Sequence, residues 1–297
     1  MAEDNKYKIL PVKKDIPVKE QFGFLPVSLF KPTKEEKKKW SHAYFNDGEL
    51  DIRQGITSTV KMSEFHAGVA ENIIRYWSLP GSRIVDPFAG RVTRAVVSTE
   101  LGREYHGYEI SPRTYNRSLK HFETLGIKPN LYLDNGVELS KTSDDFSDLI
   151  FTCPPYFDIE PYESVDGQLT DIKTYYEFIQ MIGKCAENCY RIAKSGSFCV
   201  WVVADFRDNR LGHSQLMNFH GDTITAFKNA GWLQHDIVIM ENISPFVSLT
   251  QYQAARFRYT PKTHEYILVF RKPGEYIIPD YCYEQVDDSS PLNKFFS

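Results

Sequence analysis

The feature that most constrains the fold is a regular alternation of apolar, strand-like segments with helix-like segments over most of the chain. The predicted strands lie in "RIVDPFAG", "EYHGYEI", "NLYLDNG", "DLIFTCPPY", "SGSFCVWVVADFRD", "LQHDIVIMEN" and "HEYILVFRK". Repeated βα units with apolar strands predict an α/β fold with a Rossmann-like, doubly wound and mostly parallel sheet. Because only a loop separates the last two predicted strands, we expect at least one of them to be antiparallel.

The chain divides into three predicted parts: an N-terminal extension (1–60), the main domain (61–275) and a C-terminal tail (276–297). The extension contains "KPTKEEKKKW", with five lysines against two glutamates. Such a run is typical of a solvated helix face, and contact with phosphates is the alternative. No segment approaches the ~18 apolar residues of a membrane span, and the N-terminus lacks the apolar core of a signal peptide, so we expect a cytoplasmic protein without a membrane partner.

Charge and cysteine content narrow the functional classes. The formal net charge is −4, so a nucleic acid would have to bind through a local basic surface. The five cysteines show no paired short spacing typical of a disulfide framework or a zinc site, and we predict no metal.

Acidic residues end three successive predicted strands, where doubly wound sheets bind ligands. Asp86 begins the turn "DPFAGR", in which Gly90 allows a close approach of the backbone to a ligand. Glu109 follows about 20 residues later, where adenosine-type cofactors have their ribose hydroxyls bound. Asp134 ends the third strand, within expected reach of an adenine edge. The turn is not GxGxxG, and an acidic turn repels a pyrophosphate but attracts a sulfonium group, so the sequence favours S-adenosylmethionine over NAD.

A stiff corner follows the fourth predicted strand, at Cys153-Pro154-Pro155-Tyr156. Proline fixes its own φ, lacks an N–H and drives the preceding residue out of the helical region, so the strand must end there. Fixed carbonyl acceptors beside an aromatic ring suit a site for a flat, amine-bearing group. An ordinary turn after a strand is the alternative.

Together, "DPFAG", "GYEIS" and "TCPPYF" resemble the ordered motifs of the S-adenosylmethionine-dependent DNA amino-methyltransferases, DPFxGSGT and [DNS]PPY. The resemblance covers roughly residues 62 to 272. Through "FGFLPVSLF" the chain is most similar to the DNA modification methylases of phage and bacterial genomes, which include those of restriction-modification systems. The resemblance implies the class I methyltransferase fold, S-adenosylmethionine as cofactor and DNA as partner.

The resemblance also implies roles for the cofactor residues. The main-chain amide of Phe88, the carboxylate of Asp86 and Gly90 would contact the methionine end of the cofactor. Glu109 would bind the ribose, and Asp134 would lie beside the adenine.

For the target, the resemblance implies a base flipped from the duplex. Its amine would be held by the side chain of Cys153 and the carbonyl of Pro154, with Tyr156 stacked on the ring. Two departures stand out: Arg91-Val92 replaces the usual Ser-Gly, and Cys153 replaces Ser, Asp or Asn. Cys is near Ser in size, and the Ser form of the family motif goes mostly with cytosine N4, so the resemblance implies cytosine N4 as the target. Adenine N6, an RNA substrate and a catalytically silent nucleic-acid-binding subunit are the alternatives.

A basic segment lies between the last two predicted strands, at residues 243–263. It contains Arg256, Arg258 and Lys262, no acidic residue, and several interleaved aromatic residues. Cations for phosphates and aromatic rings for stacking predict a nucleic-acid-binding loop. A structural lid over the sheet edge is the alternative.

Overall fold

The computed structural model describes residues 10, 12, 15–45, 64–157, 163–208, 215–242 and 247–284. Residues 243–246 of the expected nucleic-acid-binding loop, 46–60 of the extension and 285–297 of the tail lie outside the described residues.

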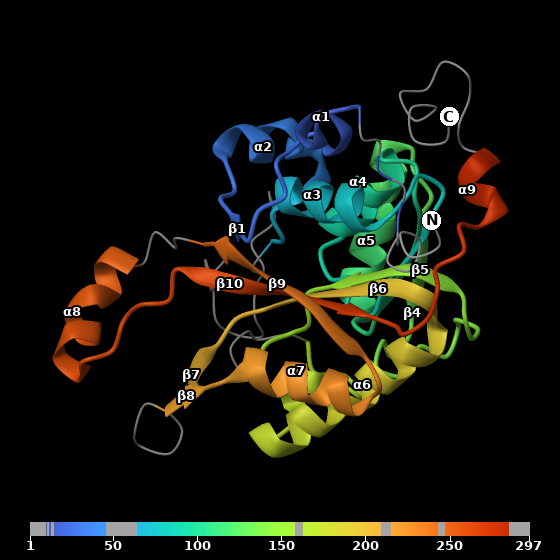
Figure 1. Ribbon diagram of the computed structural model, residues 1–297. Helices are drawn as coiled ribbons and strands as arrows, with labels where there is room; N and C mark the ends of the chain where they lie inside the picture. The colour runs from blue at the N-terminus through green and yellow to red at the C-terminus, as the bar shows by residue number, and fades with distance from the viewer. Residues whose placement is uncertain are drawn as a thin grey trace.

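A mixed α/β sheet forms the centre of the molecule (Figure 1). Its strands are β1 (Leu29–Phe30), β2 (Arg83–Asp86), β3 (Glu104–Glu109), β4 (Asn130–Leu133), β5 (Ser147–Thr152), β6 (Ala193–Val203), β9 (Leu233–Glu241) and β10 (His264–Arg271). Among the described residues, the strand order is β1-β9-β10-β6-β5-β2-β3-β4. A separate antiparallel pair is formed by β7 (Phe206–Asp208) and β8 (Gln215–Met217). The predicted doubly wound sheet is confirmed.

Strand β10 runs against its neighbours. It pairs antiparallel with both β6 and β9, whereas the other pairings within the central sheet are parallel. The expectation of an antiparallel strand near the C-terminus is therefore confirmed. The start of β10, rather than its end, lies at the edge where the parallel strands finish.

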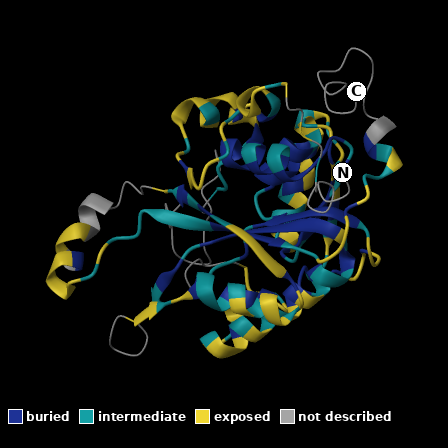
Figure 2. Cartoon of the chain, in the orientation of Figure 1, coloured by how far each residue is buried: buried dark blue, intermediate teal, exposed yellow. Residues whose placement is uncertain are grey.

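Helices cover both faces of this sheet (Figure 1). One face carries α3 (Ala67–Trp77), α4 (Thr93–Glu100) and α5 (Pro112–Leu125), and the other carries α6 (Tyr175–Ile192) and α7 (Phe219–Asn229). Strand β5 alternates between the two cores, with Leu149 and Phe151 in one and Ile150 in the other. Burial on both faces explains why central strands such as β5 and β6 are largely apolar and why they are mostly dark blue in Figure 2.

The local sequence explains where several helices begin. The side chain of Ser111 caps α5 by accepting from the amide of Thr114, and Pro112 occupies the first turn. The side chain of Thr174 caps α6 in the same way, through the amide of Glu177. These caps fix the helices that follow β3 and the proline corner.

The N-terminal extension contributes to the main body. Strand β1 pairs with β9, and the lysine-rich run forms α2 (Lys34–Lys39), which begins with a capping box on Thr33. A shorter helix, α1 (Val18–Phe22), and a 3-10 turn, η1 (Ser41–Ala43), complete this part. The sequence did not predict β1, because two residues carry no readable period.

The C-terminal part holds two further helices. In the segment expected as a loop, α8 (Val247–Phe257) projects from the body of the molecule, and α9 (Asp280–Glu284) follows β10 (Figure 1). Within the described residues, no helix combines the length and the apolar character that a membrane crossing requires.

Candidate active site

The carboxyl ends of β2, β3, β4 and β5 surround a cavity of about 460 Å³, a size typical of small-molecule sites. The turn after β2, the end of β3 and the residues after β4 line one part of it. The proline corner after β5 and the start of β10 line the other. Residues 32–34, 37 and 64–66, which precede β2 in the chain, complete the wall.

Asp86 does not reach this cavity. Its carboxylate has no exposed surface and is held by an ion pair from Arg94 Nε at 2.8 Å. Tyr105 Oη at 2.8 Å and Thr152 Oγ1 at 2.6 Å also donate to it. The structure does not support the expected contact between this carboxylate and the methionine end of a cofactor. The carboxylate oxygens of Asp86 already accept hydrogen bonds from donors inside the protein.

The ion pair instead shapes the turn that borders the cavity. The amide of Phe88 donates to Asp86 Oδ1 at 3.1 Å, and Arg94 Nη2 donates to the carbonyl oxygen of Phe88 at 2.6 Å. The Phe88 amide, expected to contact the cofactor, is thus used within the protein. Phe88 and Gly90 still line the cavity, and Gly90 has the positive φ of 54° that such a turn requires.

Glu109 lines the cavity at the end of β3, as the sequence analysis expected. Its carboxylate accepts from the amide of Ser111 at 2.7 Å and from the backbone of Gly90. Burial raises the pKa of this carboxyl to about 7, partly offset by those backbone hydrogen bonds. A largely enclosed carboxylate that faces a cavity is well suited to accept from the hydroxyls of a ribose.

Asp134 lies next to the cavity but does not line it. Its two oxygens accept from the amide of Asn135 at 2.8 Å and from Ser140 Oγ at 2.5 Å. Asn135 and Gly136 line the cavity in its place. A Cβ at Gly136 would lie 1.7 Å from the carbonyl oxygen of Pro87, so only glycine lets this loop approach the turn after β2.

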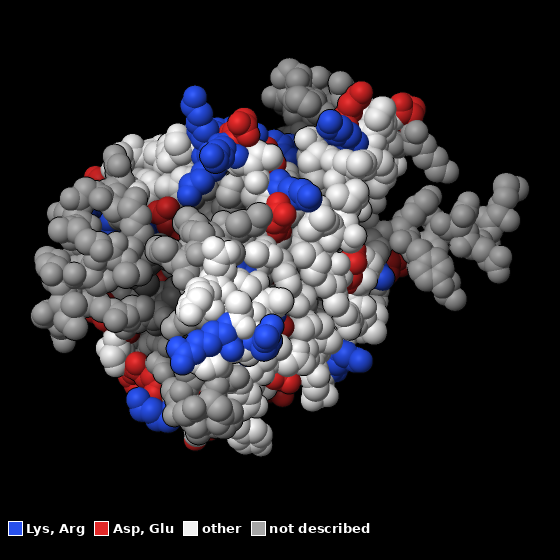
Figure 3. All heavy atoms as spheres, turned by 90° about the vertical axis from the view of Figure 1, so that its left-hand side faces the viewer, with Lys and Arg blue, Asp and Glu red and all other residues white. Residues whose placement is uncertain are grey.

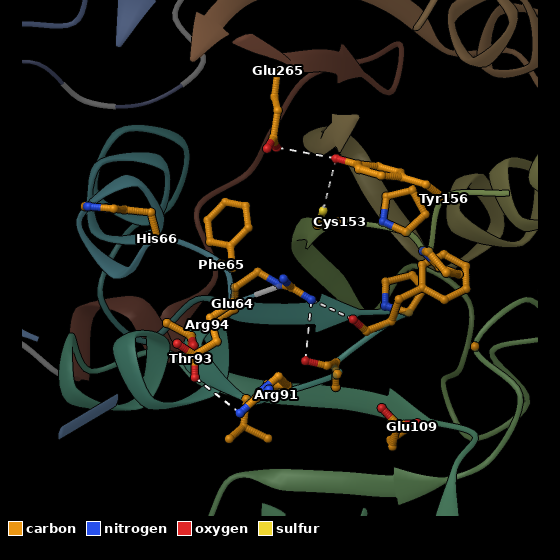
Figure 4. Close-up of a pocket in the computed structure, with 18 of the residues that line it drawn as sticks. Glu64, Phe65, His66, Arg91, Thr93, Arg94, Glu109, Cys153, Tyr156 and Glu265 are labelled. Carbon is orange, nitrogen blue, oxygen red and sulfur yellow. Dashed lines mark hydrogen bonds and ion pairs between the residues drawn. The ribbon is translucent and has the colours of Figure 1, made fainter. Parts of the chain in front are cut away.

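Arg91 and Val92, which replace the usual Ser-Gly, are accommodated in different ways. The Arg91 guanidinium pairs with Glu64 at 3.3 Å and lies over the ring of Phe45, with 10% of its side chain exposed (Figure 4). Val92 adopts a left-handed conformation, with φ of 60°, while its side chain is completely buried. The Arg91 cation is therefore held by an acidic partner, and Val92 keeps the backbone shape that a glycine would take.

The proline corner also lines the cavity. Cys153, Pro154, Pro155 and Tyr156 are all in its wall. Tyr156 Oη lies 3.8 Å from Cys153 Sγ, and the Tyr156 ring packs edge-on against the buried Phe219, with centroids 6.1 Å apart. The four residues expected at the catalytic position thus lie in one wall of the cavity that also contains Glu109.

An acidic residue that the sequence analysis missed faces this corner. Glu265, near the start of β10, accepts from Tyr156 Oη at 3.4 Å and from the side chain of Asn242 (Figure 4). It lines the cavity together with Glu241 and Asn242 at the end of β9. The antiparallel direction of β10 was the sequence signal that would have placed Glu265 at this edge.

The expected nucleic-acid-binding residues lie outside the cavity wall. Arg256 and Arg258 are exposed at the end of α8, and Lys262 pairs with Asp205 at 3.5 Å. Phe257 at the end of α8 is 62% exposed, and Figure 2 shows most of the described part of this helix as exposed. In Figure 3, which views the α8 side, basic side chains gather at the height of α2 and again lower on the near surface.

Two lysines of α2 line the cavity itself. Lys34 and Lys37 stand in its wall beside Thr33, so the lysine-rich run borders the candidate active site. Nothing in the sequence alone indicated that this segment and the proline corner lie together.

The described residues fit an adenosine cofactor. Glu109 offers an acceptor for ribose hydroxyls, Gly136 leaves room where a Cβ would clash with the backbone of Pro87, and Gly90 adopts the positive φ of the turn. Among the parts of the chain that the structure describes, no group of three or more His, Cys, Asp or Glu residues is arranged for a metal ion.

A doubly wound sheet with an acid at the end of its second main strand and an open carboxyl edge agrees with the class I methyltransferase fold. The family model described as DNA methylase matches residues 8–120 and 147–294, and the chain belongs to this family. The cofactor of this family is S-adenosylmethionine.

Several solved structures are similar to this chain. TrmN from Thermus thermophilus is 12% identical, with 80% of this chain and 53% of that chain covered and a TM-score of 0.49. A proposed DNA modification methylase from Thermus thermophilus, complexed with S-adenosyl-L-methionine, is 23% identical, with 48% and 51% covered and a TM-score of 0.36. A methyltransferase from Methanosarcina mazei is 11% identical, with 68% and 98% covered and a TM-score of 0.48.

The chain spans about half the length of the two Thermus proteins, 53% and 51%. No curated protein sequence matches the chain.

Proposed function

We propose that this protein transfers the methyl group of S-adenosylmethionine to the exocyclic amine of a base flipped out of DNA, with cytosine N4 as the preferred target. The observation that carries the proposal is the shared cavity: Glu109 and the corner Cys153–Tyr156 line the same space. A cofactor held by its ribose at Glu109 and a base held at the corner would meet within it. Membership of the DNA methylase family supports DNA as the substrate.

The corner residues would position the base for transfer. The carbonyl of Pro154 accepts one hydrogen bond from the target amine, and the ring of Tyr156 stacks on the base. The buried Phe219 supports that ring from its edge. The cofactor supplies an activated methyl group, so the main contribution of these residues is alignment of the amine for an in-line transfer.

The cofactor half of the cavity would work through a preshaped turn. The buried Asp86–Arg94 pair fixes the backbone around Phe88 and Gly90, which line the cavity and would contact the methionine end of the cofactor. Asp86 acts through Arg94 rather than on the cofactor. Asn135 and Gly136 would lie beside the adenine, with Asp134 holding their loop in place.

Two basic regions would hold the nucleic acid on either side of the flipped base. Lys34 and Lys37 border the cavity, and Arg256 and Arg258 stand on the projecting α8 region. Cations at these positions would contact phosphates, which position a duplex without reading its sequence. The exposed Phe257 adds a surface on which a base can stack.

The test is transfer of a labelled methyl group from S-adenosylmethionine to duplex DNA, single-stranded DNA or RNA. The proposal predicts label in DNA, with RNA as a poor competitor. Tyr156→Ala serves as the control, because it removes the stacking ring without touching the Glu109 side of the cavity. Preferential labelling of RNA, or equal labelling by Tyr156→Ala, would contradict the proposal.

A further inference from the structure

The corner of this protein lacks a strong side-chain acceptor for the target amine. Cys153 stands where the family pattern has Ser, Asp or Asn, and a thiol accepts hydrogen bonds weakly. A carboxylate lies close by. Glu265 is 3.4 Å from Tyr156 Oη, which in turn is 3.8 Å from Cys153 Sγ (Figure 4).

The sheet topology explains why Glu265 reaches this position. In the antiparallel pairing of β10 with β6, Tyr266 lies opposite Val203, so Glu265 is at the carboxyl edge of the sheet. In the parallel pairing of β5 with β6, Thr152 lies opposite Trp201, and Cys153 follows directly. Glu265 and Cys153 therefore meet at one edge although they are far apart in the sequence.

Hydrogen bonds hold the Glu265 carboxylate at the corner. Its oxygens accept from Tyr156 Oη and from the side chain of Asn242. A carboxylate has about four acceptor lone-pair sites, so it can accept from a ligand in addition to neighbouring protein groups. Glu265 lines the cavity beside the corner, where its carboxylate is within reach of a bound base.

We propose that Glu265 accepts a hydrogen bond from the target amine and then its proton, taking over the acceptor role that Cys153 fills weakly. The inference rests on the proposed function. In the transfer step the lone pair of the amine nitrogen forms a bond to the methyl carbon, and the sulfur–methyl bond breaks with its electron pair left on sulfur. The nitrogen then gives one proton to the Glu265 carboxylate. The products are the methylated amine, S-adenosylhomocysteine and a protonated Glu265.

The proposal predicts that Glu265 and residue 153 are energetically coupled. An amide at position 153 restores the acceptor that the family pattern places there, so Cys153→Asn makes Glu265 less necessary. A purely structural Glu265 would instead cost the same activity in either background. A double-mutant cycle separates the two cases.

The experiment compares wild type, Glu265→Gln, Cys153→Asn and the double variant. Single-turnover methyl transfer is measured on whichever nucleic acid the wild type methylates, and S-adenosylmethionine affinity is measured by calorimetry. Glu265→Gln is expected to slow transfer by about 100-fold, the lower end of what a proton acceptor contributes, with cofactor affinity within about twofold. Glu123→Gln, an exposed carboxylate on α5, is the control and is expected to leave the rate unchanged.

In the Cys153→Asn background, the loss caused by Glu265→Gln should shrink to about tenfold or less. The wild-type rate should also fall at low pH as a single group becomes protonated, and this dependence should disappear in Glu265→Gln. An unchanged rate in Glu265→Gln, or an equal loss in both backgrounds, would overturn the inference while the wild-type activity upholds the proposed function. A wild type that methylates neither DNA nor RNA would overturn both.

Discussion

Asp86 and Arg94 form an ion pair of 2.8 Å inside the protein, where Asp86 has none of its side chain exposed and Arg94 has 7%. Burial by itself lowers the pKa of Arg94, but the neighbouring Asp86 outweighs it, so that the pKa is raised and the guanidinium stays charged. The pair also connects β2 to Phe88, which lines the candidate cofactor site. An acid expected to touch the cofactor therefore acts as a structural anchor of the turn.

The first prediction concerns this anchor. Asp86→Ala leaves a buried guanidinium without its partner, and breaking a buried pair typically costs about 3–5 kcal/mol. We expect the free energy of unfolding in urea to fall by about that amount. The matched variant Asp134→Ala, whose carboxylate only holds an exposed turn, should cost about 1 kcal/mol. Unchanged stability together with a large loss of cofactor affinity in Asp86→Ala would contradict this role.

Cofactor binding should depend on pH through Glu109. The pKa of this carboxyl is raised to about 7, chiefly by burial, and the charged form is the one that accepts from ribose hydroxyls. Binding should therefore be fully developed above pH 7 and lost below it, with the dissociation constant rising by up to about tenfold per pH unit. Calorimetric titrations from pH 8 to pH 5.5 measure this dependence.

Glu109→Gln is the control for that titration. The amide cannot ionise, so its affinity for S-adenosylmethionine should be weak and nearly independent of pH over the same range. A wild-type affinity that stays constant down to pH 5.5 would show that the Glu109 carboxylate takes no part in binding.

Val92 allows a test of backbone strain. Its φ of 60° is unfavourable for any residue with a Cβ, by roughly 1–2 kcal/mol. Both Val92→Ala and Val92→Gly remove buried methyl groups, but only glycine relieves the strain. Urea unfolding should therefore find Val92→Gly more stable than Val92→Ala by about 1 kcal/mol. The opposite order, the one usual elsewhere in proteins, would mean that the turn is relaxed.

Tyr156 should be needed for the target and not for the cofactor. Base–aromatic stacking contributes about 1–3 kcal/mol per base, so Tyr156→Ala should lower methyl transfer by about 10- to 100-fold. Tyr156→Phe keeps the ring and should retain more of the rate than Tyr156→Ala. Both variants should bind S-adenosylmethionine with an affinity within about twofold of wild type. A selective loss of cofactor affinity would instead assign Tyr156 to the cofactor-binding part of the cavity.

The basic residues of the α8 region should affect DNA affinity and its salt dependence. The double substitution Arg256→Ala with Arg258→Ala removes up to two phosphate contacts, which should reduce the slope of log affinity against log salt by about 1–2. Lys128→Ala removes an exposed cation just before β4, at the opposite edge of the sheet, and serves as the control. Equal slopes of log affinity against log salt for both variants and wild type would show that the α8 region does not contact the DNA.

Much of the fold was predictable because its signals are local. Apolar runs flanked by turn residues marked each strand from β2 to β6, and the lack of a predicted helix before "HEYILVFRK" indicated the antiparallel β10. The helix in residues 247–257 was missed because the segment was interpreted from its charges and rings as a loop.

The sequence predicted those residues of the site that lie at the ends of strands. The positions of Glu109 and Tyr156 in the cavity wall follow from topology and from the proline corner. The internal partners of Asp86 do not, because Arg94, Tyr105 and Thr152 come together only in three dimensions. The position of Glu265 near Cys153 could not be predicted either, because it depends on the pairing of β10, β6 and β5.

The most direct test of the proposed methyl transfer is nucleoside mass spectrometry of unmodified DNA digested after incubation with the protein and methyl-labelled S-adenosylmethionine. We predict labelled N4-methylcytosine in the wild-type reaction and at least tenfold less with Tyr156→Ala. Labelled N6-methyladenine would keep the enzyme class and change the target base. Absence of any labelled nucleoside in DNA, with cofactor binding intact, would contradict the proposed function.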